Sequence, residues 1–225
     1  GGSVGYTLAG AAGVDILTGS GFDDTITSGG GADIVSGGDG ADAISFSAAN
    51  DNVRQTVQFS AATDGTAAGA VTGNDAITNF DANAGDATDD LIQIATGTLK
   101  TALDDDSDSA LDYAAADGAD GGNQAIVGGA NQEATVLVDL EVEINVGDLT
   151  TAGLANVITE LGEEIDFTAL ATGQEHLFIV NVSATQAGII LYTASTGADD
   201  VVDAADIQLL GIVTHNDGTN LVATD

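Results

Sequence analysis

The sequence contains no cysteine, proline, methionine or tryptophan, and only two of its 225 residues are basic. Without cysteine the chain forms no disulfides, and only His176 and His215 offer a nitrogen ligand, so zinc and copper sites are not expected. Arg54 and Lys100 stand against 36 acidic residues, which gives a formal net charge of −34. This charge excludes nucleic acid as a partner, and it must be neutralised on folding by calcium or by high salt.

The absence of several sequence motifs narrows the range of functions to expect. The chain has no H-E-x-x-H motif, no G-x-S-x-G motif and no cysteine nucleophile, so we expect no enzymatic activity and no catalytic residues. The longest wholly apolar runs, such as Leu177–Val180, are too short to span a membrane. There is no initiator methionine and no N-terminal signal peptide, so we expect a processed product or an excerpt.

Four nonapeptides in unbroken register occupy residues 10–45. Each carries an aspartate at its sixth position and an aliphatic residue at its eighth. The frames are GAAGVDILT, GSGFDDTIT, SGGGADIVS and GGDGADAIS, and the aspartates are Asp15, Asp24, Asp33 and Asp42. Residues 1–9 follow the same frame, with Tyr6 in place of the aspartate. This pattern is typical of a parallel β-roll that binds calcium, and a glycine-rich flexible linker would not keep both residue types in phase.

The chemistry of the repeat follows from its two halves. The glycines form a turn, and the last three residues form a short strand whose aliphatic residue points into the roll. Turns two repeats apart stack, so a calcium ion between them takes aspartate carboxylates and glycine carbonyls. We therefore expect Asp15 to share an ion with Asp33, Asp24 with Asp42, and Asp33 also with Asp51. The glycines expected at these sites are Gly10, Gly13, Gly19, Gly21, Gly29, Gly31, Gly38 and Gly40.

These repeats resemble those of the RTX family, calcium-binding proteins that bacteria export by type I secretion. Residues 75–80 and 90–94 resemble the stretch that often follows such repeats, which adds Asp75 and Asp90 as candidate ligands. The resemblance implies calcium as the bound ion, folding outside the cell, an extracellular or cell-surface location and a secretion signal near the C-terminus. It leaves the final function open, because toxins, enzymes, adhesins and surface-layer proteins all carry such repeats.

The remainder of the chain predicts a mainly β fold with one or two helices. Strands are expected at 53–59, in 74–94, and at 135–146, 176–182, 188–194 and 207–213. An acidic helix is expected over 101–117 and a second helix from Asp148 to Leu161. We divide the chain into a roll (1–51), a β-rich connecting region with the acidic helix (52–130) and a C-terminal β-rich domain (131–225).

Two acidic loops are weaker candidates for calcium. The loop 81–90 offers Asp81, Asp86, Asp89 and Asp90, although a solvated acidic turn is the default interpretation. Asp199, Asp203 and Asp206 have the spacing of the second half of an EF-hand-like loop, whose first half is missing. The alternative there is a polar turn before the last strand.

Three functions remain open on this sequence. The first is a calcium-dependent structural subunit of a surface layer, matrix or filament that associates with copies of itself. The second is the C-terminal export and folding module of a larger RTX enzyme or toxin. The third is an adhesin module, for which a cell-surface polysaccharide bound through calcium is the candidate partner.

Overall fold

The chain folds mainly into β-strands, as its sequence predicts. The computed structural model describes residues 4–47, 52–64, 73–82, 89–94, 113–116, 124–125, 134–137, 149, 155–157, 159, 161, 165–166, 172–183, 185–194 and 202–215. Within these residues, helical structure is confined to the 3₁₀ turn Ala62–Asp64 and to residues 155–157, 159 and 161, which lie in the helix predicted to end at Leu161.

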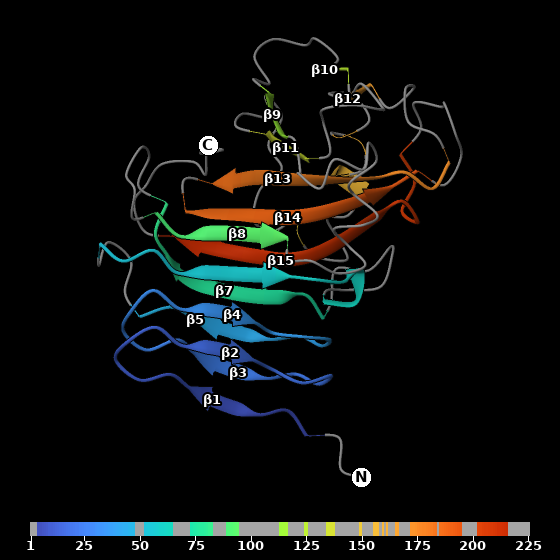
Figure 1. The fold of residues 1–225 in the computed structure, drawn as a ribbon. Helices are drawn as coiled ribbons and strands as arrows, with labels where there is room; N and C mark the ends of the chain where they lie inside the picture. Colours follow the sequence, from blue (N-terminus) through green and yellow to red (C-terminus); the bar gives the residue numbers. More distant parts are fainter. Residues whose placement is uncertain are drawn as a thin grey trace.

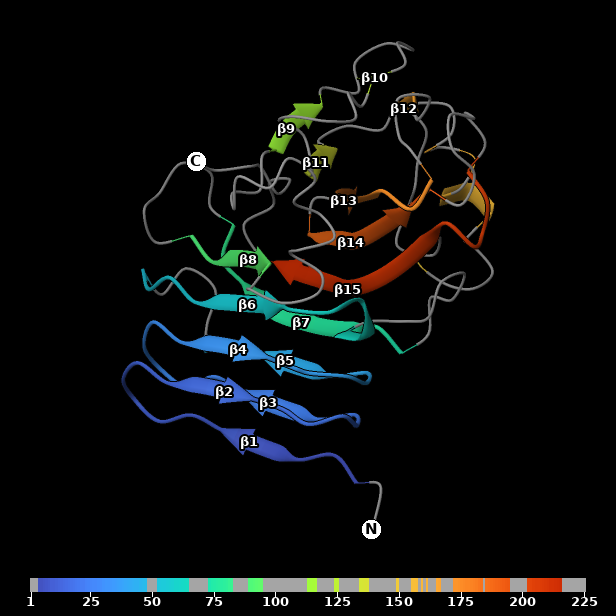
Figure 2. The same cartoon turned by 45° about the vertical axis from the view of Figure 1, so that its right-hand side comes forward.

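The N-terminal half is a parallel β-roll, seen as stacked rungs in Figure 1. Its first five strands are β1 (Thr7–Ala9), β2 (Ile16–Thr18), β3 (Thr25–Thr27), β4 (Ile34–Ser36) and β5 (Ala43–Ser45). Successive strands alternate between two sheets, so β1, β3 and β5 pair in one sheet while β2 and β4 pair in the other (Figure 2). The central residue of each strand faces inward, and Ile26, Val35 and Ile44 are fully buried.

The roll continues beyond its repeats. Strands β6 (Thr56–Phe59) and β8 (Leu91–Ile94) extend the second sheet, and β7 (Asp75–Phe80) extends the first by pairing with β5. On its other side β7 pairs in parallel with β15 (Ile207–His215), which belongs to the C-terminal part of the chain.

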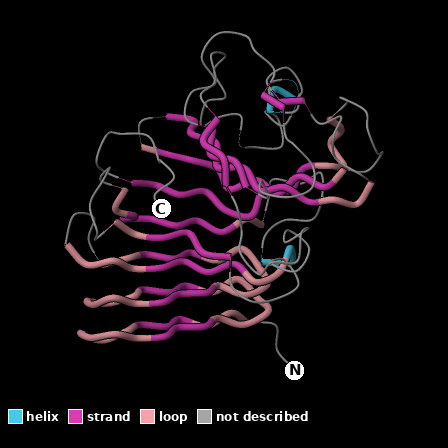
Figure 3. The backbone as a smooth tube through the Cα atoms, turned by 45° about the horizontal axis from the view of Figure 1, so that its top comes forward, coloured by secondary structure: helices cyan, strands magenta, loops and turns pink. Residues whose placement is uncertain are grey.

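A long antiparallel hairpin completes the larger sheet. It consists of β13 (Glu175–Ser183) and β14 (Gln186–Thr193), and β14 pairs with β15. Strands β11 (Ala134–Leu137) and β9 (Tyr113–Ala116) follow in parallel, which gives nine strands in the order β1-β3-β5-β7-β15-β14-β13-β11-β9. Figure 3 shows the short strands of the roll stacked below the longer strands. Strands β10 (Gln124–Ala125) and β12 (Ile165–Asp166) form a separate pair.

The hairpin is buried on both faces. Leu177 and Ile179 pack on the core that runs through the roll, whereas Phe178 and Val180 pack on a second core together with Leu161 of the helix. Both faces of β13 are therefore apolar, which explains its continuous hydrophobic run. Because one core spans the roll and the hairpin, the C-terminal strands close the upper end of the roll.

One predicted element is wrong where the structure describes it. Residues 113–116, expected at the end of the acidic helix, form strand β9, while 101–112 and 117 lie outside the described residues. Alanine is compatible with either structure, so the pairing of β9 with β11 decides the conformation. The strand expected at 135–146 is confirmed as β11 up to Leu137, and its remainder lies outside the described residues.

The other strand predictions are confirmed by β6, β7, β8, β13, β14 and β15. The nine-stranded sheet draws strands from all three predicted regions, and the division at residues 51 and 130 stays a prediction. In the part of the chain that is described, no helix is long and apolar enough to cross a membrane.

Candidate metal centre

Turns two repeats apart stack directly on one another. The Gly13 N–H donates to the Gly30 carbonyl at 2.5 Å, and the Gly30 N–H donates to the Ala11 carbonyl at 2.9 Å. These bonds join the first and third turns, as the pairing of β2 with β4 requires. The stacked carbonyls and carboxylates of such turns supply the oxygen ligands that calcium prefers.

On one edge of the roll, the aspartates form a ladder of contacts. The Asp24 N–H donates to Oδ1 of Asp42 at 2.7 Å, and the Asp42 N–H donates to Oδ1 of Asp75 at 3.0 Å. At the lowest rung the Tyr6 N–H donates to Oδ1 of Asp24. The structure thus brings the predicted pair Asp24 and Asp42 together and adds Asp75 above them.

The opposite edge has a different order. The Asp15 N–H donates to Oδ1 of Asp33 at 2.9 Å, so this predicted pair is also brought together. The pairing of Ile34 with Thr56 then puts Gln55 next to Asp33 in the stack. The nine-residue register is therefore interrupted after Asp42, and the expected pairing of Asp33 with Asp51 stays a prediction. Asp51 itself lies outside the described residues.

Gln55 is held by an uncharged network at the place where a repeat would carry an aspartate. Ser28 Oγ donates to Gln55 Oε1 at 2.5 Å, and Gln55 Nε2 donates to Ser47 Oγ at 2.8 Å. Its own N–H donates to Oδ1 of Asp90 at 2.7 Å, while Oδ2 of Asp90 accepts from the Asp81 N–H at 2.8 Å. The rung of Gln55 therefore has no carboxylate at this position, and Asp90 provides the carboxylate of the next rung.

Asp15 and Asp24 also close their own turns. Oδ2 of Asp15 accepts the Ala11 N–H at 2.7 Å, and Oδ2 of Asp24 accepts the Ser20 N–H at 2.5 Å. The predicted glycines make these turns possible through positive φ or close packing. Positive φ occurs at Gly13, Gly29, Gly31, Gly38 and Gly40. A Cβ on Gly10 or Gly19 would lie within 2.0 Å of a carbonyl oxygen. A Cβ on Gly21 would meet only Asp39, at 3.9 Å.

Burial makes two of these carboxylates costly to ionise. Desolvation raises the pKa of Asp75 to about 8, and the charges of Asp42 and Asp64 add to the rise while the hydrogen bond from Asp42 opposes it. Desolvation likewise raises the pKa of Asp42 to about 6, with Asp24, Asp23 and Asp64 contributing repulsion. All neighbouring charges that act on the two groups are negative. A cation bound there would remove both penalties.

The described residues contain no group of three or more histidines or carboxylates placed to hold one metal ion. A calcium ion in the roll would therefore take one or two aspartates and complete its shell with turn carbonyls, as the repeat chemistry predicts. Both histidines are buried, His176 in β13 beside Phe178 and His215 at the end of β15.

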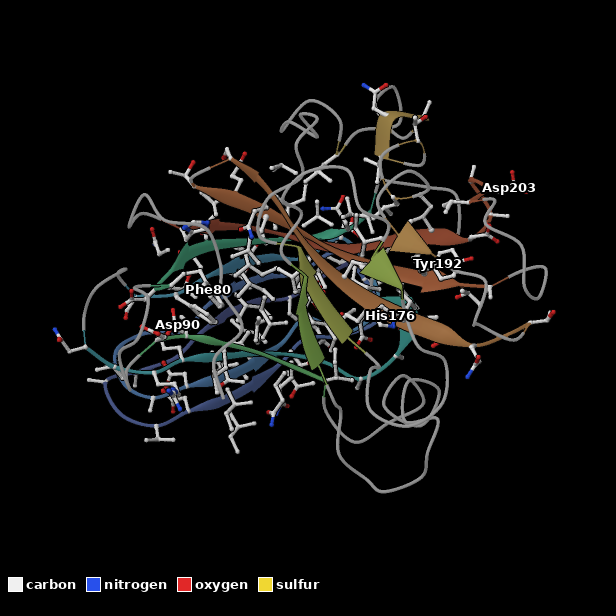
Figure 4. The ribbon with its side chains drawn as sticks, turned by 90° about the horizontal axis from the view of Figure 1, so that it is seen from above. Phe80, Asp90, His176, Tyr192 and Asp203 are labelled. Atoms are coloured by element: carbon white, nitrogen blue, oxygen red, sulfur yellow. The ribbon has the colours of Figure 1, made fainter. Side chains whose placement is uncertain are left out.

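The C-terminal acidic loop is separate from the roll sites. Asp203 and Asp90 lie at opposite sides of the molecule in Figure 4. The Asp203 N–H donates to Oδ2 of Asp206 at 2.7 Å, and the Asp206 N–H donates to the Asp203 carbonyl, which makes a tight turn before β15. Asp199 lies outside the described residues, and calcium binding by this loop stays a prediction.

Sequence reasoning missed two residues of the roll, Gln55 and Asp64. Gln55 was not predicted because it is not acidic. Asp64 was not predicted because the interruption after Asp42 places it out of phase with the repeats. The signal that could have found them was their mutual spacing of nine residues, on either side of the apolar positions Val57 and Phe59.

Comparisons with known proteins agree with this geometry. Residues 9–44 match the RTX calcium-binding nonapeptide repeat, in four copies. Neither a comparison with curated proteins nor one with solved structures gives a match. The repeats are calcium-binding motifs, so calcium is the ion of this roll. Proteins with such repeats are typically secreted.

Proposed function

We propose that this chain is a calcium-dependent structural subunit that acts outside a bacterial cell, where it associates with copies of itself in a surface layer, matrix or filament. It would be exported by type I secretion and would fold on meeting extracellular calcium. In this proposal the chain has no enzymatic activity. The observation that carries the proposal is the lower end of the roll, where β1 and β2 are edge strands that no other described strand covers.

This open end gathers the exposed apolar side chains of the described residues. They are Val4, Tyr6, Val14, Ile16 and Phe22, which are between 45% and 74% exposed. Among the described strands, β1 and β2 are sheet edges here and pair only with β3 and β4. An unpaired edge beside apolar residues is a template for another strand.

The distribution of charge supports a second copy of the chain as the partner at this end. Residues 1–22 contain a single acidic residue, Asp15, whereas the chain has 36. Two copies that each carry a charge of −34 repel one another least through this end. Calcium bound by the roll lowers the remaining repulsion, so association would depend on calcium.

Sedimentation of the full chain at equal ionic strength in calcium and in magnesium tests the proposal. We expect oligomers in calcium only, and a monomer for the variant Ile16→Glu. The matched control is Thr25→Glu, which adds the same charge on an exposed position of the interior strand β3 and should still associate. A wild-type chain that stays monomeric at high concentration in calcium would instead favour an export and folding module of a larger RTX protein.

A further inference from the structure

The turn that follows β6 contains an aspartate in the same role as those of the repeats. In the first two repeats, Oδ2 of the aspartate accepts the N–H of the residue four positions earlier, as Asp15 does from Ala11 and Asp24 does from Ser20. Oδ2 of Asp64 accepts the Ser60 N–H in the same way, at 2.5 Å and over the same four residues. It also accepts from the Ala61 N–H at 3.0 Å. Asp64 thus closes a turn of the same kind.

The register of the strands supports this equivalence. Because Val57 pairs with Val35, Gln55 occupies the aspartate position of β6, and Asp64 follows it by nine residues. The chain therefore makes one more repeat-like turn, outside residues 9–44. Strands β4 and β6 are parallel neighbours, so the turns that follow them stack on the same edge.

On the level of the stack above Asp42, two aspartates make the hydrogen bonds that Asp24 makes alone on its own level. Asp24 closes its own turn through Oδ2 and accepts the N–H of the rung below through Oδ1. One level above Asp42, the first task falls to Asp64 and the second to Asp75, which accepts the Asp42 N–H. This level therefore carries two buried carboxylates, whereas the turns of Asp24 and Asp42 each carry one.

The three carboxylates on and next to this level are buried and close enough to repel one another. Asp42, Asp64 and Asp75 are 2%, 4% and 1% exposed. The charge of Asp64 raises the pKa of both other groups, after the larger effect of burial. Oδ2 of Asp42 is buried and has no hydrogen-bond partner. It lies against its own turn, because a Cβ on Gly37 would be only 2.0 Å from it.

We propose that Asp42 and Asp64 hold a further divalent cation between the turn 37–42 and the turn 59–64. The unpartnered Oδ2 of Asp42 points into the lower turn, and Asp64 comes from the turn stacked above it. Backbone carbonyls complete the shell, since three carboxylates do not converge among the described residues. The inference rests on the calcium binding of the roll and adds a site from a residue outside its four repeats.

This ion would join the roll to the C-terminal strands. Asp75 begins β7, whose two neighbours are β5 of the roll and β15 of the C-terminal part. Asp64 ends the 3₁₀ turn in which the Ala62 carbonyl accepts from Gln208 Nε2 of β15. A cation between the two turns would therefore hold the roll and the C-terminal strands together at the place where they join in the nine-stranded sheet.

The number of calcium ions bound by the full chain tests the proposal. Native mass spectrometry in calcium should show one ion fewer for Asp64→Asn than for the wild type. The control Asp39→Asn, at an exposed aspartate of the turn 37–42 that makes no hydrogen bond among those described, should bind the wild-type number. An unchanged number for Asp64→Asn overturns the proposal, whereas a wild type that binds no calcium at all overturns calcium binding by the roll itself.

A second variant covers the case in which Asp64→Asn does not fold. Asp64→Glu keeps the charge and moves it by one methylene. Calorimetric titration with calcium should then show at least a tenfold weaker affinity for one ion, with the other ions unchanged. If the affinities of all ions equal those of the wild type, Asp64 is not a ligand and the proposal fails.

Discussion

The backbone N–H of Asp24 donates a 2.7 Å hydrogen bond to the carboxylate of Asp42, eighteen residues later in the chain. The bond connects two levels of the roll through a buried anion. It holds one oxygen of Asp42 in place and leaves Oδ2 without a hydrogen-bond partner. The aspartates of this edge therefore join successive turns to one another and also present oxygen atoms for a cation.

Replacing Asp42 should damage the roll far more than replacing its exposed neighbour Asp39. Asp42→Ala removes a buried hydrogen bond to a charged group, so the free energy of unfolding in calcium should fall by about 2 kcal/mol. Calcium affinity should fall as well, because a ligand is lost. Asp39→Ala should change the stability by less than about 0.5 kcal/mol. Urea unfolding in excess calcium measures both.

The choice of control matters for this experiment. Asp23 is also exposed, but its Oδ1 accepts the Ala41 N–H at 2.9 Å, so its removal breaks a contact between turns. Asp39 makes no hydrogen bond among those described and lies at the surface of its turn. Equal losses for Asp42→Ala and Asp39→Ala would mean that calcium acts through diffuse charge rather than through ordered sites.

Without calcium, stability should fall as the pH rises. The pKa values of Asp42 and Asp75 in the folded chain, about 6 and about 8, exceed the ordinary value of 3.8. The folded chain then binds more protons than the unfolded chain between these limits, so its stability is highest on the acidic side and is lost as the pH rises through both values. Thermal unfolding in chelator should give a cooperative transition at pH 5, and a lower midpoint or no transition at pH 8.5.

The variant Asp75→Asn separates this local effect from the general repulsion of the acidic chain. It removes the carboxyl with the larger pKa shift, so the midpoint in chelator should depend less on pH between 6 and 8.5. Saturating calcium should weaken the dependence in the wild type too, because the ion replaces the protons. A wild-type midpoint that rises with pH in chelator would contradict the assignment.

The roll was predictable because its signal is local and repeated. Each strand is specified by one aliphatic residue between two outward-facing ones, and each turn by glycines at fixed positions, so four copies in phase leave little freedom. Strands β13 and β14 were predictable for another reason, since continuous apolar runs such as residues 177–180 indicate burial on both faces.

The interruption after Asp42 was not predictable from the same signal. Position counting leads to Asp51, but the core requires Val57 over Val35, and this pairing sets the register. Hydrophobic packing of the inward residue outweighs the spacing of the carboxylates. Strand β9 was missed for a related reason, because its pairing with β11 is a long-range contact that local propensity does not reveal.

Calcium should convert the full chain from a weakly structured to a folded state. Buried aspartates such as Asp24, Asp33 and Asp42 oppose folding until a cation compensates them, and its binding free energy adds to the stability. Each site contributes about 2.7 kcal/mol when calcium is present at about 100 times its dissociation constant. Circular dichroism in chelator and then in millimolar calcium should show a large gain of β signal. An unchanged spectrum would show that the roll folds without the ion.

The adjacent glycines Gly30 and Gly31 should respond differently to replacement by alanine. Gly31 has a φ of 127°, and a Cβ there would lie 2.1 Å from the Gly13 carbonyl oxygen of the stacked turn. Gly31→Ala must therefore separate the two turns and strain the backbone, at a cost of about 1–3 kcal/mol. Gly30 faces open space, since a Cβ at that position would have no heavy atom within 4 Å and φ is not strained, so Gly30→Ala should be close to neutral. Because the turns also position the carbonyl ligands, Gly31→Ala should weaken calcium binding in a calorimetric titration while Gly30→Ala should not. If both variants titrate like the wild type, close stacking of these turns is not needed to form the calcium sites.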